Sequence, residues 1–464
     1  MPVDTTHSKY DELAPFWERM RDAVKGEDQI KKRSTRYLPI PPGLGKGSES
    51  PEYKNYKARA RYPETVSPAI EGMVGLMGRK LNEPELPDAL KYLENEATPD
   101  GLTLSDLINR LRHEVCTVGR YVLFVDLPED GGDPYIATYA AESVINWRAK
   151  DDSLVLIVFE ETVAEVDPQD PFVVKDVDQW RVASIEQERD EDGNAVGPER
   201  YMVRVYRKNE NAGKDESSFY IAEEYAPVRQ GKPLDYVPAI IVGSRDLTPE
   251  PDAIPLLGVA NKSLHYYRQY ADYAMQLFMS ANGTTPYIFG SESAPSVIGP
   301  TEVWHAEDPQ AKAGYIEVSG AGLEAQKAEL DNIKEEIAYA TVRVLGDKKA
   351  AEAAETLRLR FQSQTATLAS ISKATSAGLQ QALRFCAEWM GANPDAVNVP
   401  AEAEFISEEV DAQFMTALYD GIERGFVPDD LLIEYTRRIE LHDMDSDEYR
   451  KFAAGMMAEG GGEE

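Results

Sequence analysis

The side chains that most often carry catalysis or bind metals are few in this sequence and far apart. The histidines are His7, His113, His265, His305 and His442. The motifs H-E-x-x-H, G-x-S-x-G, G-x-G-x-x-G and C-x-x-C are all absent. Carboxylate pairs occur throughout a chain with 82 Asp and Glu residues, so none stands out as a general acid and base. The sequence therefore predicts no enzyme, no metal site and no cofactor.

The glycine-rich stretch at residues 43–48 comes closest to a phosphate-binding loop. That motif needs a glycine six residues before its lysine and a Ser or Thr directly after it. Around Lys46 these places hold Ile40 and Gly47, so we expect a plain loop. The two cysteines, Cys116 and Cys386, lie in apolar helical patterns, which predicts small buried side chains in a reducing compartment.

The charge of the chain argues against binding by phosphate neutralisation. The 464 residues include 49 Lys and Arg, which gives a net charge of −33, whereas nucleic-acid binders usually show an excess of basic residues. An acidic solvated surface explains this excess of acidic residues. A surface that DNA can pass without binding to it is a more specific alternative. No apolar run approaches the roughly eighteen residues of a membrane helix.

One short segment, residues 53–61, departs from the acidic composition. It combines Lys54, Lys57, Arg59 and Arg61 with two tyrosines. Such a segment could touch a phosphate backbone or an acidic neighbouring subunit, and a solvated helix face is the plainer interpretation.

The longest regular patterns lie between residues 255 and 345. Pro255 suits a helix start and Asn282-Gly283 a helix end. Between them run two adjacent apolar stripes, Leu256, Val259, Ser263, Tyr266, Tyr270, Tyr273, Leu277 and Leu257, Ala260, Leu264, Tyr267, Ala271, Ala274, Phe278. A second helix sets Leu323, Leu330, Ile333, Ile337 and Val344 on one side.

We therefore expect an antiparallel helix pair joined by a compact insert with two short strands. The pair could be the core of a helical domain. The two stripes, however, make a face broader than one partner helix covers, which favours contact with another copy of the chain.

Helices and strands are expected to alternate before this pair. A T-x-x-D capping box at residues 103–106 opens a helix that ends at Gly119. Short strands are expected at residues 121–126, 134–138, 154–159, 180–185, 201–206 and 238–242. After a break at residues 346–355, a further helix is expected over 356–390.

The order of several segments carries a resemblance to a known family. These are Arg36-Tyr37-Leu38-Pro39, residues 107–125, residues 141–147, Val237-Pro238, Pro255-Leu256, Asn261, His265-Tyr266-Tyr267-Arg268, Ala271-Asp272, the helix from Leu323 and Glu355-Thr356. No single motif is diagnostic, but their order covers nearly the whole length. The chain resembles the portal proteins of tailed bacteriophages and prophages, in the group with a portal-type domain of formerly unknown function.

The resemblance implies an α+β portal fold with a mixed wing, a two-helix stem, a small clip, a long wing helix and a helical crown. The implied boundaries are residues 1–250 for the wing, 251–282 and 321–345 for the stem helices, 283–320 for the clip, 346–355 for the tunnel loop, 356–394 for the long wing helix, and 395–464 for the crown with a disordered tail.

It further implies a structural protein of the virion, assembled in the bacterial host cytoplasm without cofactor or membrane. Portal subunits form homo-oligomeric rings, usually twelvefold, at one capsid vertex. They contact the major capsid protein, the large terminase subunit and a head–tail adaptor, and double-stranded DNA passes through them non-specifically during packaging and ejection. The alternative is another ring-forming or scaffold virion protein without a DNA conduit.

Three groups of candidate residues follow. Those expected to face the channel and DNA are Lys262, Arg268, Lys327, Lys334, Lys348 and Lys349. Those expected at the contact between subunits are Leu256, Val259, Tyr266, Tyr270, Tyr273 and Leu277. In the clip, Trp304 and His305 are candidates for contact with the adaptor or terminase.

Overall fold

The computed structural model divides the chain into two compact units, Met1–Glu402 and Ala403–Glu464. It describes residues 2–44, 47–79, 84–127, 132–167, 170–189, 195–209, 218–229, 231–282, 285–289, 308–316, 322–345 and 354–401. All of these belong to the first unit, so most of the expected crown lies outside the described residues. The fold of the described part is α+β, as predicted.

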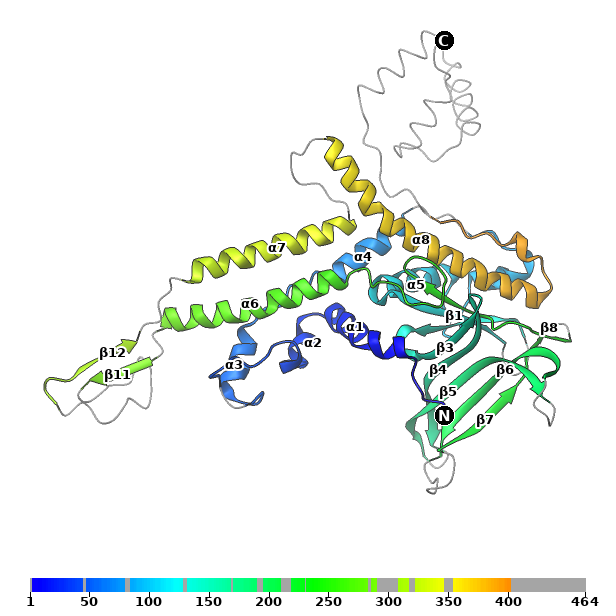
Figure 1. Ribbon diagram of the computed structural model, residues 1–464, viewed down its shortest axis with the longest axis horizontal. Coiled ribbons are helices and arrows are strands. Elements are labelled where there is room, and N and C mark those ends of the chain that lie inside the picture. Colours follow the sequence, from blue (N-terminus) through cyan, green and yellow to red (C-terminus); the bar gives the residue numbers. More distant parts are fainter. Residues whose placement is uncertain are drawn as a thin grey trace, which may run out of the picture. The chain divides into compact units, whose positions relative to one another are not determined.

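Four short helices form the amino-terminal layer (Figure 1). They are α1 (Ser8–Lys25), α2 (Glu27–Lys32), α3 (Pro51–Arg59) and α4 (Val66–Met77), with a 3₁₀ turn η1 at Ser34–Arg36. The Ser50 side chain caps α3 by accepting a hydrogen bond from the backbone N–H of Tyr53. The buried core of this layer includes Trp17, Met20 and Ile30.

A buried carboxylate, Asp22, ties α1 to α2 and η1. Its oxygens accept hydrogen bonds from Gln29 Nε2 at 2.7 Å, Arg33 Nε at 2.9 Å and the Tyr37 hydroxyl at 2.7 Å. Burial works to raise the pKa of Asp22, but these hydrogen bonds and the charge of Arg33 outweigh it, so its pKa lies below the usual value. The ionised carboxylate is therefore the form that the folded chain stabilises.

This carboxylate should make stability depend on pH. Because its pKa is lower in the folded chain than the unfolded value of about 3.9, its contribution is present above that value and is lost as the pH falls below it. We expect Asp22→Asn to unfold at lower urea concentration at neutral pH and to show a flatter decline between about pH 5 and pH 2. Asp28→Asn, at an exposed position on α2, is the control. Parallel urea midpoints for the wild type and Asp22→Asn over this range would contradict the role of Asp22.

Next in the chain are α5 (Leu104–Val118) and a three-stranded antiparallel sheet. Thr103 caps α5 as predicted, and Gly119 ends it with φ +79°. A Cβ at Gly119 would lie 3.1 Å from the Ala253 carbonyl oxygen, so both its conformation and its surroundings favour glycine. The strands, in the order β10-β1-β2, are β1 (Arg120–Asp126), β2 (Tyr135–Ala140) and β10 (Ala239–Gly243).

The second sheet has five antiparallel strands in sequence order. They are β3 (Val144–Lys150), β4 (Ser153–Asp167), β5 (Asp170–Arg189), β6 (Ala195–Lys208) and β7 (Phe219–Tyr225). The predicted strands at 154–159, 180–185 and 201–206 exist, but each is the part of a longer strand that faces the core. The core lies between the two sheets and includes Phe124, Trp147, Phe159 and Tyr201.

Three long helices complete the described part. They are α6 (Leu257–Asn282), α7 (Leu323–Leu345) and α8 (Ala354–Met390); between α6 and α7 lies an antiparallel hairpin of β11 (Thr285–Phe289) and β12 (Lys312–Ile316). Both the helix pair and the strands of its insert are confirmed. The predicted break at residues 346–355 falls mostly outside the described residues.

Helix α8 packs on the three-stranded sheet and on α5. A Cβ at Gly378 would lie 2.4 Å from Val242 Cγ2 on β10, so only glycine allows this approach. The buried side of α8 includes Cys386, and Cys116 is buried in α5, as predicted. The remaining short elements are η2 (Asp88–Glu94), η3 (Ala141–Ser143), β8 (Val228–Arg229), β9 (Lys232–Pro233) and η5 (Pro394–Ala396). Among the described helices, none combines the length and apolar content that crossing a membrane requires.

Candidate functional site

Helices α6 and α7 pack side by side in opposite directions (Figure 1). Lys262 in the first half of α6 pairs with Glu336 in the second half of α7. One turn further along α6, Tyr266 lies under Lys334, whose Nζ is 5.7 Å from the ring centroid. At the far end of the pair, Gln276 approaches Gly322. Within residues 323–341 of α7, the buried side chains are Leu330, Ile333 and Ile337.

The first half of α6 is covered by its own chain. Leu256, Val259 and Tyr266 are buried, as are Leu264 and Tyr267 of the second stripe. The covering elements include α7 on one side and α1 and α3 on the other. These three members of the predicted subunit contact therefore pack inside the chain that carries them, and their place in a contact with another copy stays an untested prediction.

The second half of α6 is more open. Tyr270 and Tyr273 are half-buried, Leu277 is 44% exposed and Phe278 is 36% exposed. The first half of α6 is thus core, whereas the second half keeps partly exposed apolar side chains. Tyr270, Tyr273 and Leu277 remain candidates for the subunit contact.

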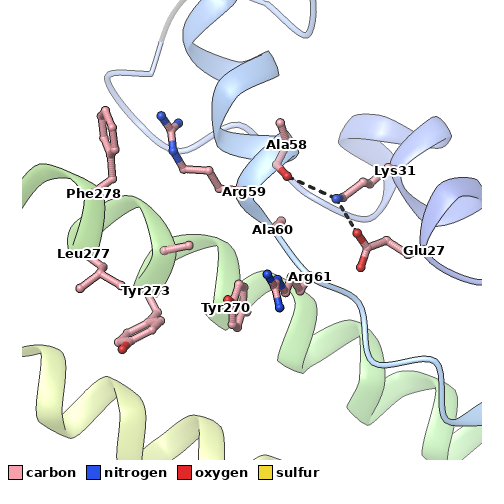
Figure 2. Close-up of a pocket in the computed structure, with 11 residues that line it drawn as sticks. Glu27, Lys31, Ala58, Arg59, Ala60, Arg61, Tyr270, Tyr273, Leu277 and Phe278 are labelled. Carbon is pink, nitrogen blue, oxygen red and sulfur yellow. Dashed lines mark hydrogen bonds and ion pairs between the residues drawn. The ribbon is translucent and has the colours of Figure 1, made fainter.

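These side chains line a groove of about 450 Å³ between α6 and the segment after α3 (Figure 2). Its lining residues are Glu27, Lys31, Ala58, Arg59, Ala60, Arg61, Tyr270, Tyr273, Ala274, Leu277 and Phe278. One side is therefore aromatic and aliphatic, and the other side is basic. Tyrosine and arginine are the residue types enriched at the centres of protein–protein interfaces.

The basic side of the groove comes from the segment that the sequence singled out at residues 53–61. The Arg59 guanidinium stacks on the Phe278 ring, 3.9 Å from its centroid, and donates to the Asn55 carbonyl oxygen at 3.1 Å. Lys31 pairs with Glu27 at 2.6 Å, whereas Arg61 is exposed. Sequence reasoning found the basic segment, but not that it faces the open end of α6.

A hydrogen bond fixes α3 against α6 beside this groove. The Tyr56 hydroxyl donates to Asp272 Oδ1 at 2.6 Å. Burial and the bond to this carboxylate raise the pKa of Tyr56, so the phenol stays a neutral donor at physiological pH. The groove is therefore bounded by elements that are held together within one chain.

Most of the described channel candidates are engaged within the chain. Besides the Lys262–Glu336 pair, Arg268 Nε donates to the Tyr37 carbonyl oxygen at 2.8 Å, and Lys334 lies 3.5 Å from Asp331. Lys327 is exposed on α7. Lys348 and Lys349 lie outside the described residues, as do Trp304 and His305 of the expected clip. The assignment of these residues to the channel and the clip stays a prediction.

The face of α7 that points away from its buried side is acidic. It carries, at helical spacing, the exposed residues Glu324, Ala328, Asp331, Glu335 and Tyr339. We call these five residues the acidic face of α7. In the described part of the chain, no cluster of three or more His, Cys, Asp or Glu side chains could hold a metal ion.

Comparison with known proteins yields one family and several solved structures. A family described as "Domain of unknown function (DUF4055)" matches residues 255–390, which is α6 to the end of α8 and less than half of the chain. No curated protein matches the sequence.

The solved structures include "Virion of native gene transfer agent (GTA) particle", with 13% identity over 88% of this chain and 92% of that one and a TM-score of 0.35. They also include "Neck of empty GTA particle computed with C6 symmetry", with 12% identity over 88% and 93% and a TM-score of 0.36. A third is "Neck of native GTA particle computed with C12 symmetry", with 13% identity over 81% and 91% and a TM-score of 0.33. TM-scores this low do not establish a shared fold.

Proposed function

We propose that this chain is a portal-type subunit, which forms a ring at one vertex of a phage-like particle and conducts double-stranded DNA. The observation that carries the proposal is the unequal covering of α6. Its first half is sealed inside the chain, whereas its second half opens into the groove with an aromatic side and a basic side. A groove of this kind, on a chain with a net charge of −33, suits a head-to-tail contact with the next copy, and such contacts form a ring when the rotation between copies closes.

The order of elements supports the same proposal. A helix pair joined by a small hairpin and followed by a long helix is the order on which the resemblance to portal proteins rests. In this proposal α6 and α7 are the stem, the insert with β11 and β12 is the clip, and residues 346–355 form the tunnel loop. The clip, with Trp304 and His305, contacts the terminase or the adaptor, and the wing contacts the capsid protein.

Assembly is tested directly by imaging the purified chain by negative-stain electron microscopy, with mass photometry at micromolar concentration. The proposal predicts rings with a central hole, usually twelvefold. Monomers at every salt and protein concentration would contradict it. Rings that assemble but do not support DNA packaging with the cognate terminase would favour the alternative, a ring-forming virion protein without a conduit.

The acidic face of α7 suits the lining of a channel through which DNA slides. We expect the ring to bind double-stranded DNA weakly, with a shallow dependence of affinity on salt, because few phosphates are neutralised. Replacing both Glu324 and Glu335 with lysine should steepen the slope of log K against log salt by about 2 per engaged subunit, since each phosphate contact adds about 0.9.

The matched control for this pair is Glu94→Lys with Glu96→Lys, which changes the net charge equally at exposed positions in and beside η2. Salt titrations of DNA binding that give the same slope for both double variants would contradict a channel lined by α7. Tight, sequence-specific binding by the wild type at physiological salt would contradict the conduit itself.

A further inference from the structure

The hairpin of β4 and β5 extends beyond the rest of its sheet as an arm. β3 pairs with β4 only as far as Phe159, and β6 pairs with β5 only from Gln179 onwards. The strand segments 160–167 and 170–178 therefore pair only with each other. We call these two segments the arm. A two-stranded ribbon is at best marginally stable in water by itself, so an arm of this length benefits from a partner.

The end of the arm carries a concentrated apolar surface. Phe172 is 94% exposed, and Val163, Val166, Val173 and Val174 are exposed as well. Val166 lies opposite Val174, so these two side chains share a face, and Phe172 lies two residues before Val174 in the stretch 171–173, which has no partner on β4. Exposed apolar clusters of this kind mark interaction sites more often than isolated exposed residues do.

Contacts within the arm hold this face in place. Lys175 Nζ pairs across the strands with Asp167 at 2.7 Å, and the Thr162 hydroxyl donates to Asp178 at 3.0 Å. The backbone N–H of Phe172 donates to Asp170 Oδ1 at 3.0 Å. The paired residues on both sides of Phe172, and the hydrogen bond of its own backbone, therefore hold the end of the arm in place, which lowers the entropic cost of inserting Phe172 into a partner.

An apolar cleft of about 340 Å³ lies at the opposite end of β4. It is lined by Asp152, Ser153, Leu154, Tyr236, Val237, Ala239, Ile240, Ile241, Leu247, Pro249, Gln381 and Phe385. The rings of Tyr236 and Phe385 stack with their centroids 4.8 Å apart and form an aromatic wall. Aliphatic side chains of β10 and the segment after it supply much of the remaining lining, so the cleft suits an aromatic side chain with a small aliphatic neighbour.

The arm cannot reach the cleft of its own chain. Leu154 at the cleft and Val166 near the end of the arm lie on one continuous strand, twelve residues apart. At about 3.3 Å per residue the strand separates them by roughly 40 Å. A donor surface and a receptor surface at opposite ends of the same strand can meet only between copies, in a head-to-tail contact.

We infer that the arm is an exchange arm: Phe172, with Val166 and Val174, inserts into the apolar cleft of a second copy of this chain. The inference adds a second contact between subunits to the proposed ring. It rests on the proposed function only in that both require a second copy of the chain. The contact joins the five-stranded sheet of one copy to the cleft between β10 and α8 of the next, whereas the groove on α6 supplies the contact at the helix pair.

Engineered disulfides test the contact in the full-length chain. Val173→Cys, an exposed position beside Phe172, combined with Ser153→Cys, at the cleft, should give a ladder of cross-linked species on a non-reducing gel after mild oxidation. Every such bond is intermolecular, because the paired strands β4 and β5 hold the two positions at opposite ends of the hairpin. The native cysteines contribute little background, since burial raises the pKa of both Cys116 and Cys386. Val173→Cys with Lys373→Cys, an exposed position on α8 outside the cleft, is the matched control.

A second variant measures the apolar contribution. Phe172→Asp should weaken association about 30-fold at this contact, whereas Phe172→Leu should stay close to wild type. If the Phe172→Asp variant forms the same rings as the wild type and the double-cysteine variant gives no ladder, the arm contact is wrong and the proposed ring still stands. A ladder from a chain that forms no rings would support the arm contact and contradict the proposed ring. Equal ladders in the test and control pairs would overturn the arm contact.

Discussion

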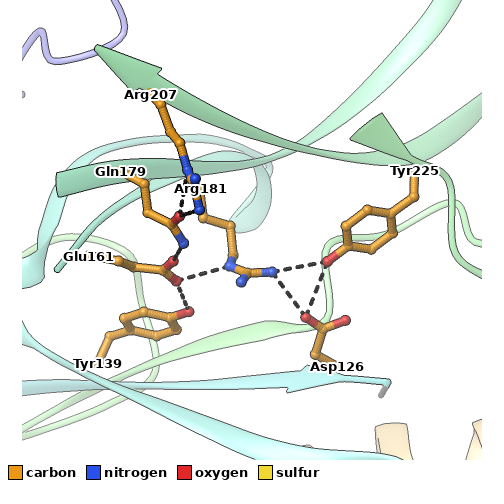
Figure 3. A network of polar contacts seen from close by, with 7 residues as sticks. All are labelled: Asp126, Tyr139, Glu161, Gln179, Arg181, Arg207 and Tyr225. Atoms are coloured by element: carbon orange, nitrogen blue, oxygen red, sulfur yellow. Dashed lines mark hydrogen bonds and ion pairs between the residues drawn. The ribbon is translucent and has the colours of Figure 1, made fainter. Parts of the chain in front are cut away.

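Replacing Arg181 with alanine is expected to lower the free energy of unfolding by about 3–5 kcal/mol, because the change leaves the buried carboxylate of Asp126 and the largely buried carboxylate of Glu161 without their cation. Arg181 lies on β5 and connects the two sheets (Figure 3). Its Nε donates to Glu161 Oε1 at 2.9 Å, and its Nη1 donates to the Tyr225 hydroxyl at 3.0 Å and lies 3.4 Å from Asp126 Oδ2.

The surroundings of Asp126 explain the expected size of this effect. Asp126, at the end of β1, is buried, and burial raises the pKa of its carboxyl group against the hydrogen bond from Leu127 and the charge of Arg181. Removing Arg181 removes one of the interactions that keep this carboxylate ionised. Glu161 keeps only neutral partners, the Tyr139 hydroxyl and Gln179 Nε2. The chain must then protonate a carboxylate or bury an unpaired charge, and either costs stability.

Arg204→Ala is the matched control, because it removes an arginine from the neighbouring strand β6. Arg204 pairs with Glu186 and Glu224, whose side chains are 37% and 45% exposed, so we expect a loss of at most about 1 kcal/mol. Urea unfolding with unchanged m-values measures both variants. Similar shifts of the two urea midpoints would show that the buried network contributes no more than a surface pair.

The second large effect is expected at the groove on α6. Replacing Tyr270 and Tyr273 with aspartate should abolish rings at micromolar concentration. If burial of each ring contributes about 2 kcal/mol per contact, the double variant weakens each contact by about 4 kcal/mol, or roughly a thousandfold. The new carboxylates would also meet the acidic surface of the next copy. Mass photometry gives the distribution of assembled species directly.

The same variant must leave the single chain folded for this result to be informative. Tyr270 stacks with Tyr266 and Tyr273 at centroid distances of 5.8 and 6.2 Å, so the double variant loses about 0.5–1.5 kcal/mol for each aromatic pair within the chain. Circular dichroism and a urea midpoint check that the monomer survives. His265→Asp, on the exposed side of α6, should keep wild-type rings. Rings that persist in the tyrosine double variant would remove the groove from the subunit contact.

The sequence by itself determined the long helices and their ends. The apolar spacing of three and four residues predicted α6, α7 and α8 to within a few residues, because a helix that buries one side must repeat at that period. Thr103 and Gly119 fixed α5, since capping depends on local groups alone. The absence of catalytic motifs and the α+β order were likewise readable from local patterns.

Only the tertiary structure decided which apolar surface is covered and by what. A helical stripe shows that Leu256 and Leu277 share a face, but not that the chain covers the first and exposes the second. In the same way, Lys262 and Arg268 resemble free cations until their partners on distant segments are known. The sequence did not predict the arm, because its strands continue through exposed valines and charged residues. In such a stretch the alternation of apolar and polar residues no longer indicates burial. Only pairing between the two strands maintains the β conformation there.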